Sequence, residues 1–342
     1  MRAGLSGSAK LRGAFIGFGN VAANGHLPGW LARSDVEIVA ASDATPGRRE
    51  VFLAACPKAR WFEQAGDLIA AGGIDFVDIC TPPGSHAALI RQALSAGLHV
   101  LCEKPLATRA EDALALAVVR NGRVLHTVHN WLEAPISRKV SELVSSGALG
   151  DIRRVEWQTL RTQPAVTVAI KGAENWRVDP AMAGGGILFD HGWHALYCVL
   201  RWAGKAPTAV SARLETRKFR EWPLEDTATV DLDFAGATGR VYLTWTADER
   251  ANRLEIEGSE GRLRIEGPEV ILTGRAGETR FACPPALSEG SHHPDWFDGI
   301  ARDFLAAIRQ GGEGNLPEAL LCARLIDLAQ RSSAAGGKTL AL

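Results

Sequence analysis

Short apolar runs alternate with helix-like segments through the first third of this chain. The helix-like segments span residues 48–55, 86–96 and 110–120. The apolar runs around them cover residues 14–16, 36–41, 76–80, 99–102 and 124–128. Alternation of this kind predicts an α/β fold with a doubly wound parallel sheet. We expect this domain to occupy residues 10–130.

The pattern changes after residue 131, where apolar and polar residues alternate with a period of two. Period-two segments cover residues 152–161, 208–218, 227–234, 239–246, 253–257 and 262–266, and the last two flank a glycine-bounded turn. Such segments predict strands, and the turn predicts a hairpin. Helices are expected at residues 136–146, 296–309 and 317–330. We therefore expect a C-terminal α+β domain over residues 131–338 with a large, mostly antiparallel open sheet. One face of such a sheet needs a cover of helices or of another subunit, which favours a homodimer or homotetramer.

The composition limits what the chain can bind. Its 342 residues exceed the size at which a single core usually stops growing, which agrees with two domains. The formal net charge is −1 without a dense Lys/Arg block, so nothing indicates a nucleic-acid or anionic-membrane partner. No apolar run approaches the roughly 18 residues of a spanning helix, and the N-terminal residues do not resemble a signal peptide. Six scattered cysteines without a CxxC pair favour reduced thiols and give no zinc motif. We expect a cytoplasmic protein without a membrane partner.

A glycine-rich loop directly follows the first apolar run. Residues 17–22 match the pattern G-x-G-x-x-A, whose small residues let backbone amides approach a pyrophosphate at a helix N-terminus. Asp43 ends the second run, at about the spacing of a carboxylate that holds the adenosine ribose. It would repel the 2′-phosphate of NADP and so favours NAD, whereas Arg48 either offsets that repulsion or lies in solvent. The candidate dinucleotide-binding residues of this region are Gly17, Phe18, Gly19, Asn20, Val21, Asp43 and Arg48.

Two further turns are expected at the carboxyl ends of strands, where open α/β sheets bind their ligands. The turn at 81–86 is stiffened by two prolines, and its histidine either lines the cofactor site or has a structural role, which we favour. A Glu-Lys-Pro triplet at 103–105 follows the run 99–102. Its Lys104 is well placed to act on a bound small molecule, whereas an isolated loop lysine usually points into water. The candidate cofactor-binding residues of these turns are Thr81, Pro82, His86, Glu103 and Lys104.

A later motif places an acid and a base four residues apart. Three glycines at 184–186 precede Asp190 and His194, which would share one face of a helix and could pair there. The glycines would let the chain approach a ligand and would leave helix amides free. In such a pair the carboxylate orients the imidazole and supports its charged form, as a general acid/base requires. A purely structural pair is the alternative. A metal held by these residues is disfavoured, because His191 would point about 100° away from Asp190 on a helix.

The glycine loop 17–22, the triplet 103–105 and the glycines 184–186 followed by Asp190 and His194 together resemble the Gfo/Idh/MocA family of oxidoreductases (glucose–fructose oxidoreductase, inositol dehydrogenase and rhizopine catabolism). The resemblance covers nearly the whole chain. It implies an N-terminal NAD(P)-binding Rossmann domain and a C-terminal substrate-binding and oligomerisation domain. It also implies that Lys104, Asp190 and His194 meet over the nicotinamide, and that the bond after Lys104 is a candidate for the cis form.

One stretch departs from the family pattern. The family often carries an Asn/Arg-Arg-aromatic run after the last Rossmann strand, whereas this chain reads Val-His-Asn-Trp-Leu at 128–132. The missing arginine is expected to change the substrate contacts, so the substrate of a known member does not transfer. Candidate substrate-facing residues are His129, Asn130, Trp176 and Arg177, with packing and a surface ion pair as an equal alternative for the last two.

These residues predict an NAD(P)-dependent enzyme that transfers hydride between the nicotinamide and a secondary alcohol or ketone of a sugar, sugar derivative or cyclitol. His194 would accept the hydroxyl proton, Asp190 would orient His194, and Lys104 would stabilise charge on the substrate oxygen. Ten tryptophans mildly favour such a carbohydrate or polyol, because aromatic rings line sugar sites. Two alternatives stay open, namely a lyase or glycosidase that uses transient oxidation by tightly held NAD, and a nucleotide-binding regulator without chemistry. Neither the substrate nor the direction of the reaction follows from the sequence.

Overall fold

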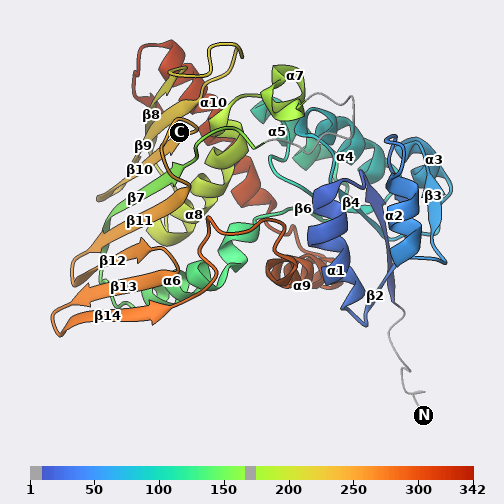
Figure 1. Ribbon diagram of the computed structural model, residues 1–342, viewed down its shortest axis with the longest axis horizontal. Helices are drawn as coiled ribbons and strands as arrows, with labels where there is room; N and C mark the ends of the chain where they lie inside the picture. Colours follow the sequence, from blue (N-terminus) through green and yellow to red (C-terminus); the bar gives the residue numbers. More distant parts are fainter. Residues whose placement is uncertain (1–9, 166–174) are drawn as a thin grey trace. The chain divides into compact units, whose positions relative to one another are not determined.

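The computed structural model describes residues 10–165 and 175–342, and its contacts divide the chain into two compact units (Figure 1). The first unit contains the chain up to Leu106 together with residues 114–128 and Ser291–Leu316. The second unit contains the described parts of the remainder. A late segment of the sequence therefore belongs to the first unit.

The first unit is built on a six-stranded parallel sheet. In sheet order its strands are β3 (Arg60–Phe62), β2 (Val36–Ser42), β1 (Leu11–Ile16), β4 (Phe76–Ile79), β5 (His99–Cys102) and β6 (Leu125–Thr127). Every neighbouring pair is parallel, which confirms the predicted doubly wound sheet. The strand order reverses between β1 and β4, and open α/β sheets bind their ligands at such a point.

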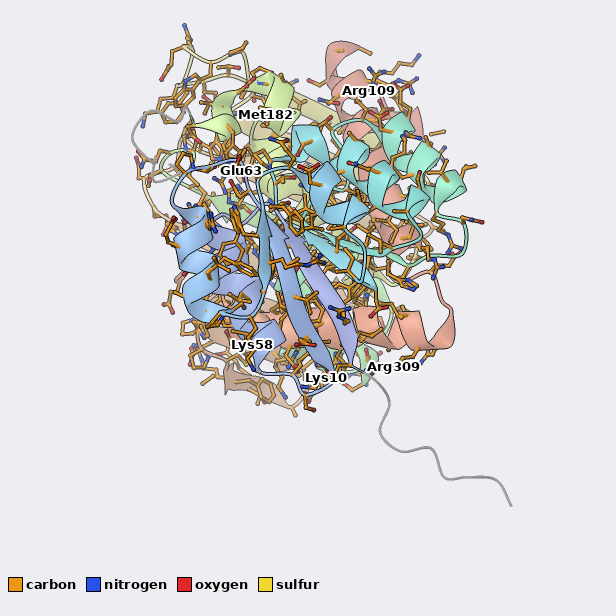
Figure 2. The ribbon with its side chains drawn as sticks, turned by 90° about the vertical axis from the view of Figure 1, so that its right-hand side faces the viewer. Lys10, Lys58, Glu63, Arg109, Met182 and Arg309 are labelled. Atoms are coloured by element: carbon orange, nitrogen blue, oxygen red, sulfur yellow. The ribbon has the colours of Figure 1, made fainter. Side chains whose placement is uncertain are left out.

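Because all strands of this sheet are parallel, they begin at one edge of the sheet and end at the opposite edge. Figure 2 labels Lys10, which directly precedes β1, and Glu63, which directly follows β3, at opposite ends of the strands. The loops at 17–22, 81–86 and 103–105 follow β1, β4 and β5, which are consecutive neighbours in the sheet. The parallel direction of the strands therefore brings these three predicted loops together at the edge that Glu63 marks.

Helices complete the first unit. They are the π-helical turn η1 (Ala22–His26), α1 (Leu27–Leu31), α2 (Arg48–Ala55), α3 (Ala65–Ala70), the 3₁₀ turn η2 (Pro83–Ser85), α4 (His86–Ser95), α5 (Ala110–Val119), which is divided between the units, and α9 (Pro294–Gln310). Helix α9 packs against η1 and α1. Its Phe297 lies 5.1 Å from the ring of Trp30, and its Phe304 lies 5.4 Å from the ring of Phe76. The apolar face of α9 thus belongs to the core of the first unit.

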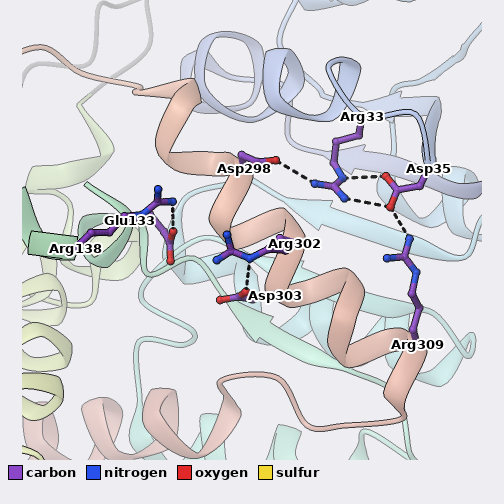
Figure 3. Close-up of polar contacts among 8 residues, drawn as sticks. All are labelled: Arg33, Asp35, Glu133, Arg138, Asp298, Arg302, Asp303 and Arg309. Carbon is purple, nitrogen blue, oxygen red and sulfur yellow. Dashed lines mark hydrogen bonds and ion pairs between the residues drawn. The ribbon is translucent and has the colours of Figure 1, made fainter. Parts of the chain in front are cut away.

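Ion pairs attach both ends of α9 to the first unit (Figure 3). Arg33 donates to Asp298 near the start of the helix and to Asp35, each at 3.0 Å, and Arg309 at its end contacts Asp35 as well. Hydrogen bonds from Arg33 outweigh the effect of burial and, with Arg309, lower the pKa of Asp35 to about 2. Figure 3 also draws the pair Glu133 and Arg138, which belongs to the second unit.

The second unit is built on a nine-stranded sheet. In sheet order its strands are β14 (Gly277–Ala282), β13 (Glu269–Gly274), β12 (Gly261–Glu266), β11 (Ala251–Gly258), β7 (Ile152–Leu160), β10 (Ala237–Thr244), β9 (Thr227–Phe234), β8 (Ala209–Glu215) and β15 (Leu340–Ala341). Only the pair β7 and β10 is parallel within the described residues, so the predicted mostly antiparallel sheet is confirmed. The predicted hairpin joins β11 to β12, with Glu257 opposite Arg262.

Helices pack against one face of this sheet. The helical elements of the second unit are the 3₁₀ turn η3 (Asn130–Glu133), α6 (Pro135–Ser145), the 3₁₀ turn η4 (Trp176–Val178), α7 (Pro180–Ala183), the π-helical turn η5 (Leu188–Gly192), α8 (Trp193–Ala203) and α10 (Leu316–Ala334). Helix α8 packs against β7 and β10, and α6 packs against α8 and β13. Among the described residues, none of the helices combines the length and the apolar character needed to cross a bilayer.

The other face of the nine-stranded sheet carries charged side chains in pairs. Arg240 of β10 donates to Asp231 of β9 at 2.6 Å, and Arg280 of β14 contacts Glu269 of β13 at 3.0 Å. Arg264 of β12 contacts Glu278 of β14 at 3.1 Å. The predicted association of subunits through this sheet stays a prediction, and any partner would have to accommodate this charged surface.

Candidate active site

The glycine loop after β1 follows the predicted pattern. Gly17 has a φ of +84°, and a Cβ there would lie 2.6 Å from Thr81 Cγ2, so only glycine fits. Its N–H donates to the carbonyl of Ser42 at 2.8 Å. At Gly19, by contrast, no described atom lies within 4 Å of an added Cβ. This open space beside the backbone, next to Val21 at the start of η1, fits the pyrophosphate of a dinucleotide.

Asp43 lies at this loop, as its spacing predicted. Its Oδ2 accepts the N–H of Phe18 and its Oδ1 accepts the N–H of Thr45, each at 2.7 Å. Arg48 donates to Asn20 Oδ1 at 3.1 Å, so it contacts the loop and does not lie free in solvent. The Phe18 ring is buried in the core, so only the backbone of Phe18 is available to a ligand at the loop. The carboxylate and the guanidinium are both held beside the loop.

The Glu-Lys-Pro triplet after β5 is fixed on both sides of Lys104. Glu103 Oε2 accepts the backbone N–H of Lys104 at 3.0 Å, and Glu103 Oε1 lies 3.1 Å from His26 Nε2. The carbonyl of Pro105 lies 2.8 Å from His86 Nδ1. The peptide bond between Lys104 and Pro105 is cis, as the family resemblance implied. Hydrogen bonds to His26 and His86 thereby hold both chain neighbours of Lys104 in place.

His86 and the turn around it form a buried support. The other ring nitrogen of His86, Nε2, lies 2.8 Å from the carbonyl of Thr81, and burial lowers the pKa of the imidazole. Ser85 donates its hydroxyl to the carbonyl of Pro82 at 2.8 Å. His86 is fully buried and joins the loops after β4 and β5, in line with the structural role that the sequence favoured.

His194 lies in the first turn of α8, within the second unit. Its Nδ1 is 2.7 Å from the hydroxyl of Tyr197, which also accepts the backbone N–H of Trp131 at 3.0 Å. The imidazole stacks on the Trp131 ring with centroids 4.3 Å apart and planes 10° apart. Residues three apart share a helix face, so Tyr197 is well placed to contact His194. The orientation of His194 is therefore fixed by a phenol and an indole.

The surroundings of Asp190 differ from the expectation in one respect. Residues 188–192 form a π-helical turn, which is wider than an α-helical turn, and the predicted divergence of His191 from Asp190 was wrong. His191 Nδ1 lies 3.1 Å from Asp190 Oδ2. Arg177 Nε lies 3.8 Å from Asp190 Oδ1. The predicted pairing of Asp190 with His194 stays a prediction.

The glycines before this turn allow close packing within the protein. A Cβ on Gly186 would lie 1.9 Å from the carbonyl oxygen of Glu225, which excludes any other residue. The N–H of Ile187 donates to that carbonyl at 3.1 Å, and the N–H of Leu188 donates to Glu225 Oε1 at 3.0 Å. Burial raises the pKa of this carboxyl group. The expectation that the glycines leave helix amides free was wrong, because Glu225 accepts those amides.

His129 lies against Tyr197, the residue that contacts His194. It is buried, its Nδ1 lies 2.7 Å from Glu318 Oε1, and its Nε2 accepts the indole N–H of Trp193 at 3.0 Å. Its ring stacks on Tyr197 with centroids 4.1 Å apart. Burial opposes the charge of Glu318, but the hydrogen bond from His129 and the nearby Arg201 lower the pKa of this carboxyl overall. Since both ring nitrogens have partners within the protein, His129 supports Tyr197 and does not face a substrate in this arrangement.

The remaining predicted substrate residues have different environments. Asn130 begins η3, and its buried Oδ1 accepts no hydrogen bond from the described residues. Trp176 and Arg177 lie in η4, and the guanidinium carbon of Arg177 is 4.4 Å from the centre of the Trp176 ring. Arg177 therefore contacts both an aromatic ring and Asp190.

Three residues that contact the predicted site residues were not predicted from the sequence. Tyr197 and Trp131 contact His194, and His26 contacts Glu103. The helical spacing of three from His194 was a usable signal for Tyr197. Trp131 and His26 reach their partners through the fold, and no local pattern marks them.

Two family models match the chain. One, described as the oxidoreductase family with an NAD-binding Rossmann fold, matches residues 11–129. The other, described as the GFO/IDH/MocA C-terminal domain, matches residues 137–264. The chain belongs to the GFO/IDH/MocA family. This family member is accordingly an oxidoreductase with an NAD-binding Rossmann domain, as its sequence predicted.

Curated relatives of this family member include two D-apiose dehydrogenases. The enzyme of Paraburkholderia graminis is 29% identical over 324 residues, which cover 89% of this chain and 82% of the relative. The enzyme of Rhizobium rhizogenes is 29% identical over 351 residues, which cover 96% of each. Among solved structures, an oxidoreductase of Agrobacterium radiobacter in complex with NAD⁺, L-tartaric acid and magnesium has a TM-score of 0.84 at 26% identity, covering 97% of this chain and 98% of that one.

Proposed function

We propose that this protein is an NAD-dependent dehydrogenase that oxidises a secondary alcohol of a sugar, sugar derivative or cyclitol, or catalyses the reverse reduction. The family and the two D-apiose dehydrogenases support the substrate class. The observation that carries the proposal is the orientation of His194, whose Nδ1 lies 2.7 Å from the Tyr197 hydroxyl while its ring stacks on Trp131. A base for a hydroxyl proton needs such a fixed ring.

The cofactor is proposed to lie along the glycine loop. The backbone of Gly17 and Gly19 would approach its pyrophosphate, and Asp43 would accept from the adenosine ribose. NAD supplies the hydride acceptor when it is bound. Asp43 is held by two backbone N–H groups, and a carboxylate held there disfavours the 2′-phosphate of NADP. Arg48 is engaged with Asn20, which supports NAD over NADP.

His194 is proposed to move the proton. In this proposal its Nδ1–H donates to the Tyr197 oxygen, which also accepts from Trp131, so both lone pairs of the phenol are used. Nε2 then takes the hydroxyl proton, and the phenol oxygen stabilises the resulting imidazolium. Asp190, four residues earlier, supports that charge. Lys104, by family resemblance, donates to the substrate oxygen and stabilises its developing negative charge.

The test is an assay of NADH absorbance with aldoses, aminosugars, sugar nucleotides and inositols, each with NAD and with NADP. We expect NADH formation with at least one of these compounds. We also expect His194→Ala and Lys104→Ala each to reduce turnover by about 100-fold or more. Lys58→Ala is the matched control, since Lys58 is an exposed lysine of the same unit as Lys104 (Figure 2).

Other outcomes would contradict the proposal in different ways. Conversion of a substrate without net NADH would indicate transient oxidation. Binding of NAD without conversion of any compound in the panel would favour a regulator. Wild-type turnover by both alanine variants would remove the proposed roles of His194 and Lys104.

A further inference from the structure

A buried chain of polar groups runs beneath the Glu-Lys-Pro triplet within the first unit. It begins at Asp78 in β4, whose Oδ1 and Oδ2 lie 3.1 and 3.0 Å from Nδ1 of His26. It continues from His26 Nε2 to Glu103 Oε1 at 3.1 Å. It ends where Glu103 Oε2 accepts the backbone N–H of Lys104 at 3.0 Å. Three elements far apart in the sequence, β4, η1 and the loop after β5, are thereby joined to Lys104.

Both ring nitrogens of His26 face carboxylates. A neutral imidazole carries one donor and one acceptor, so one nitrogen would turn a lone pair towards a carboxylate oxygen. An imidazolium donates from both nitrogens and satisfies both carboxylates. Burial opposes the charge of His26, but the carboxylate of Asp78 outweighs it and raises the pKa of the imidazole well above its ordinary value. The pKa of Glu103 is lowered despite burial, chiefly by the hydrogen bond and charge of His26.

The other groups around His26 close the cluster. The Phe297 ring of α9 stacks on the imidazole with centroids 4.3 Å apart. The indole N–H of Trp30 donates to Asp78 Oδ2 at 2.8 Å. The thiol of Cys80 lies 3.3 Å from His26 Nδ1 and donates to Asp78 Oδ1 at 3.4 Å, and burial raises its pKa. Asp78, Cys80 and Glu103 are thus the titratable groups that contact His26 among the described residues.

The cluster contains three groups that are common metal ligands. The donor atoms of His26, Asp78 and Cys80 lie within 4.8 Å of one another. The nitrogen, oxygen and sulfur atoms that could bind a metal all take part in the hydrogen bonds described above. We therefore assign the cluster to hydrogen bonding.

We propose that His26 is a positioning residue that, as an imidazolium, links Asp78 to Glu103 and so fixes the backbone of Lys104 at the end of β5. This inference rests on the proposed function for the role of Lys104 in turnover, but the charged bridge itself does not. Without His26, Glu103 loses a charged donor, and its carboxylate is free to turn away from the Lys104 N–H. A small displacement of a catalytic group reduces turnover without removing the binding site.

The first experiment measures the bridge alone. Protein labelled with ¹⁵N in its histidine rings is examined by NMR near neutral and mildly alkaline pH. We expect both ring nitrogens of His26 to remain protonated in the wild type and the ring to become neutral in Asp78→Asn. A neutral His26 in the wild type, or stoichiometric zinc in the purified protein, would overturn the bridge. This measurement needs no substrate, so it separates failure of the bridge from failure of the proposed function.

The second experiment measures the consequence for turnover. We expect His26→Gln to reduce kcat by roughly tenfold to 100-fold, with KM for NAD changed by no more than about twofold. We expect added imidazole to restore part of the activity of His26→Ala. His99→Gln is the matched control, because His99 accepts the Val124 N–H at the opposite end of β5. Wild-type kcat in His26→Gln, or no rescue by imidazole, would overturn the positioning role.

Discussion

At the scale of single residues, two stacked pairs of rings surround His194. Trp131 lies against His194 at 4.3 Å, and His129 lies against Tyr197 at 4.1 Å. The Tyr197 hydroxyl contacts both His194 and the backbone of Trp131. Flat stacking restricts the tilt of each ring, and the hydroxyl fixes rotation within the plane. The sequence motif alone assigned that orientation to Asp190.

Tyr197→Phe is expected to lower kcat about tenfold while leaving KM for NAD unchanged, because His194 loses the phenol that orients it. It also leaves the buried N–H of Trp131 without its acceptor, which is expected to lower the free energy of unfolding by about 1–3 kcal/mol. Steady-state kinetics and urea unfolding measure the two effects. The chain has two tyrosines, and Tyr242→Phe, which removes a hydroxyl 3.4 Å from Arg217, is the control. Equal kcat in both variants would contradict the role of Tyr197.

The two glycines of the cofactor loop are expected to respond differently to alanine. Gly17→Ala combines a positive φ with a clash against Thr81, so it should lower both the melting temperature and the affinity for NAD. The added methyl group of Gly19→Ala contacts no described atom, so the melting temperature should stay unchanged. The methyl group would occupy the space proposed for the pyrophosphate, so the affinity for NAD should fall by about tenfold or more. Titration calorimetry and thermal unfolding test this. Gly236→Ala, strained by a φ of +80° in the second unit, should lower stability without changing NAD affinity. A Gly19→Ala variant with wild-type affinity would show that the cofactor does not approach this loop.

At the scale of elements, the π-helical turn η5 and helix α9 show what sequence patterns leave undetermined. The apolar spacing around residues 188–192 fits α- and π-helical turns alike, and only Glu225, distant in sequence, reveals how the first amides are bound. A helix was predicted at residues 296–309, and the structure has it at 294–310 with one apolar face. The apolar face alone does not show whether the helix packs in the core of the first unit or of the second. Local pattern thus identifies the element, whereas partners distant in sequence decide its role.

Asp35 is expected to make the attachment of α9 dependent on pH. Its pKa is lowered to about 2 in the folded protein from an ordinary value of 3.8, so its contribution to stability is fully present above about pH 4. The contribution is lost as the pH falls towards 2. Asp35→Asn should therefore melt below the wild type at neutral pH, and the difference should shrink between pH 4 and pH 2. Asp303→Asn, whose exposed carboxylate contacts its neighbour Arg302, is the control. A difference that does not change with pH would contradict this assignment.

At the scale of the whole molecule, the fold was more predictable than the site. The alternation of short apolar runs with helix-like segments up to residue 128 predicted the parallel sheet, because strands joined by helices run parallel. Of the site, the sequence predicted Gly17, Asp43 and Lys104 because they follow strands directly. It did not predict the chain from Asp78 through His26 to Glu103, since those residues are brought together only by strand order. Nor could it predict that His129 would have both nitrogens engaged by Glu318 and Trp193.

Binding of NAD is expected to stabilise the molecule by mass action. At a concentration 100 times its dissociation constant, NAD should add about 2.7 kcal/mol to the free energy of unfolding. Scanning calorimetry should show a higher melting temperature with NAD than with NADP at equal concentration. If the two units unfold in separate transitions, only the transition of the first unit should move. An equal or larger shift with NADP would contradict the assigned preference.

The return of residues 291–316 to the first unit has a consequence for synthesis on the ribosome. Trp30 and Phe76 are translated long before the rings that pack against them, Phe297 and Phe304. The nascent six-stranded sheet must wait with part of its apolar surface uncovered until residues 291–316 have been made. We therefore expect the unfinished chain to bind chaperones that recognise exposed aromatic side chains.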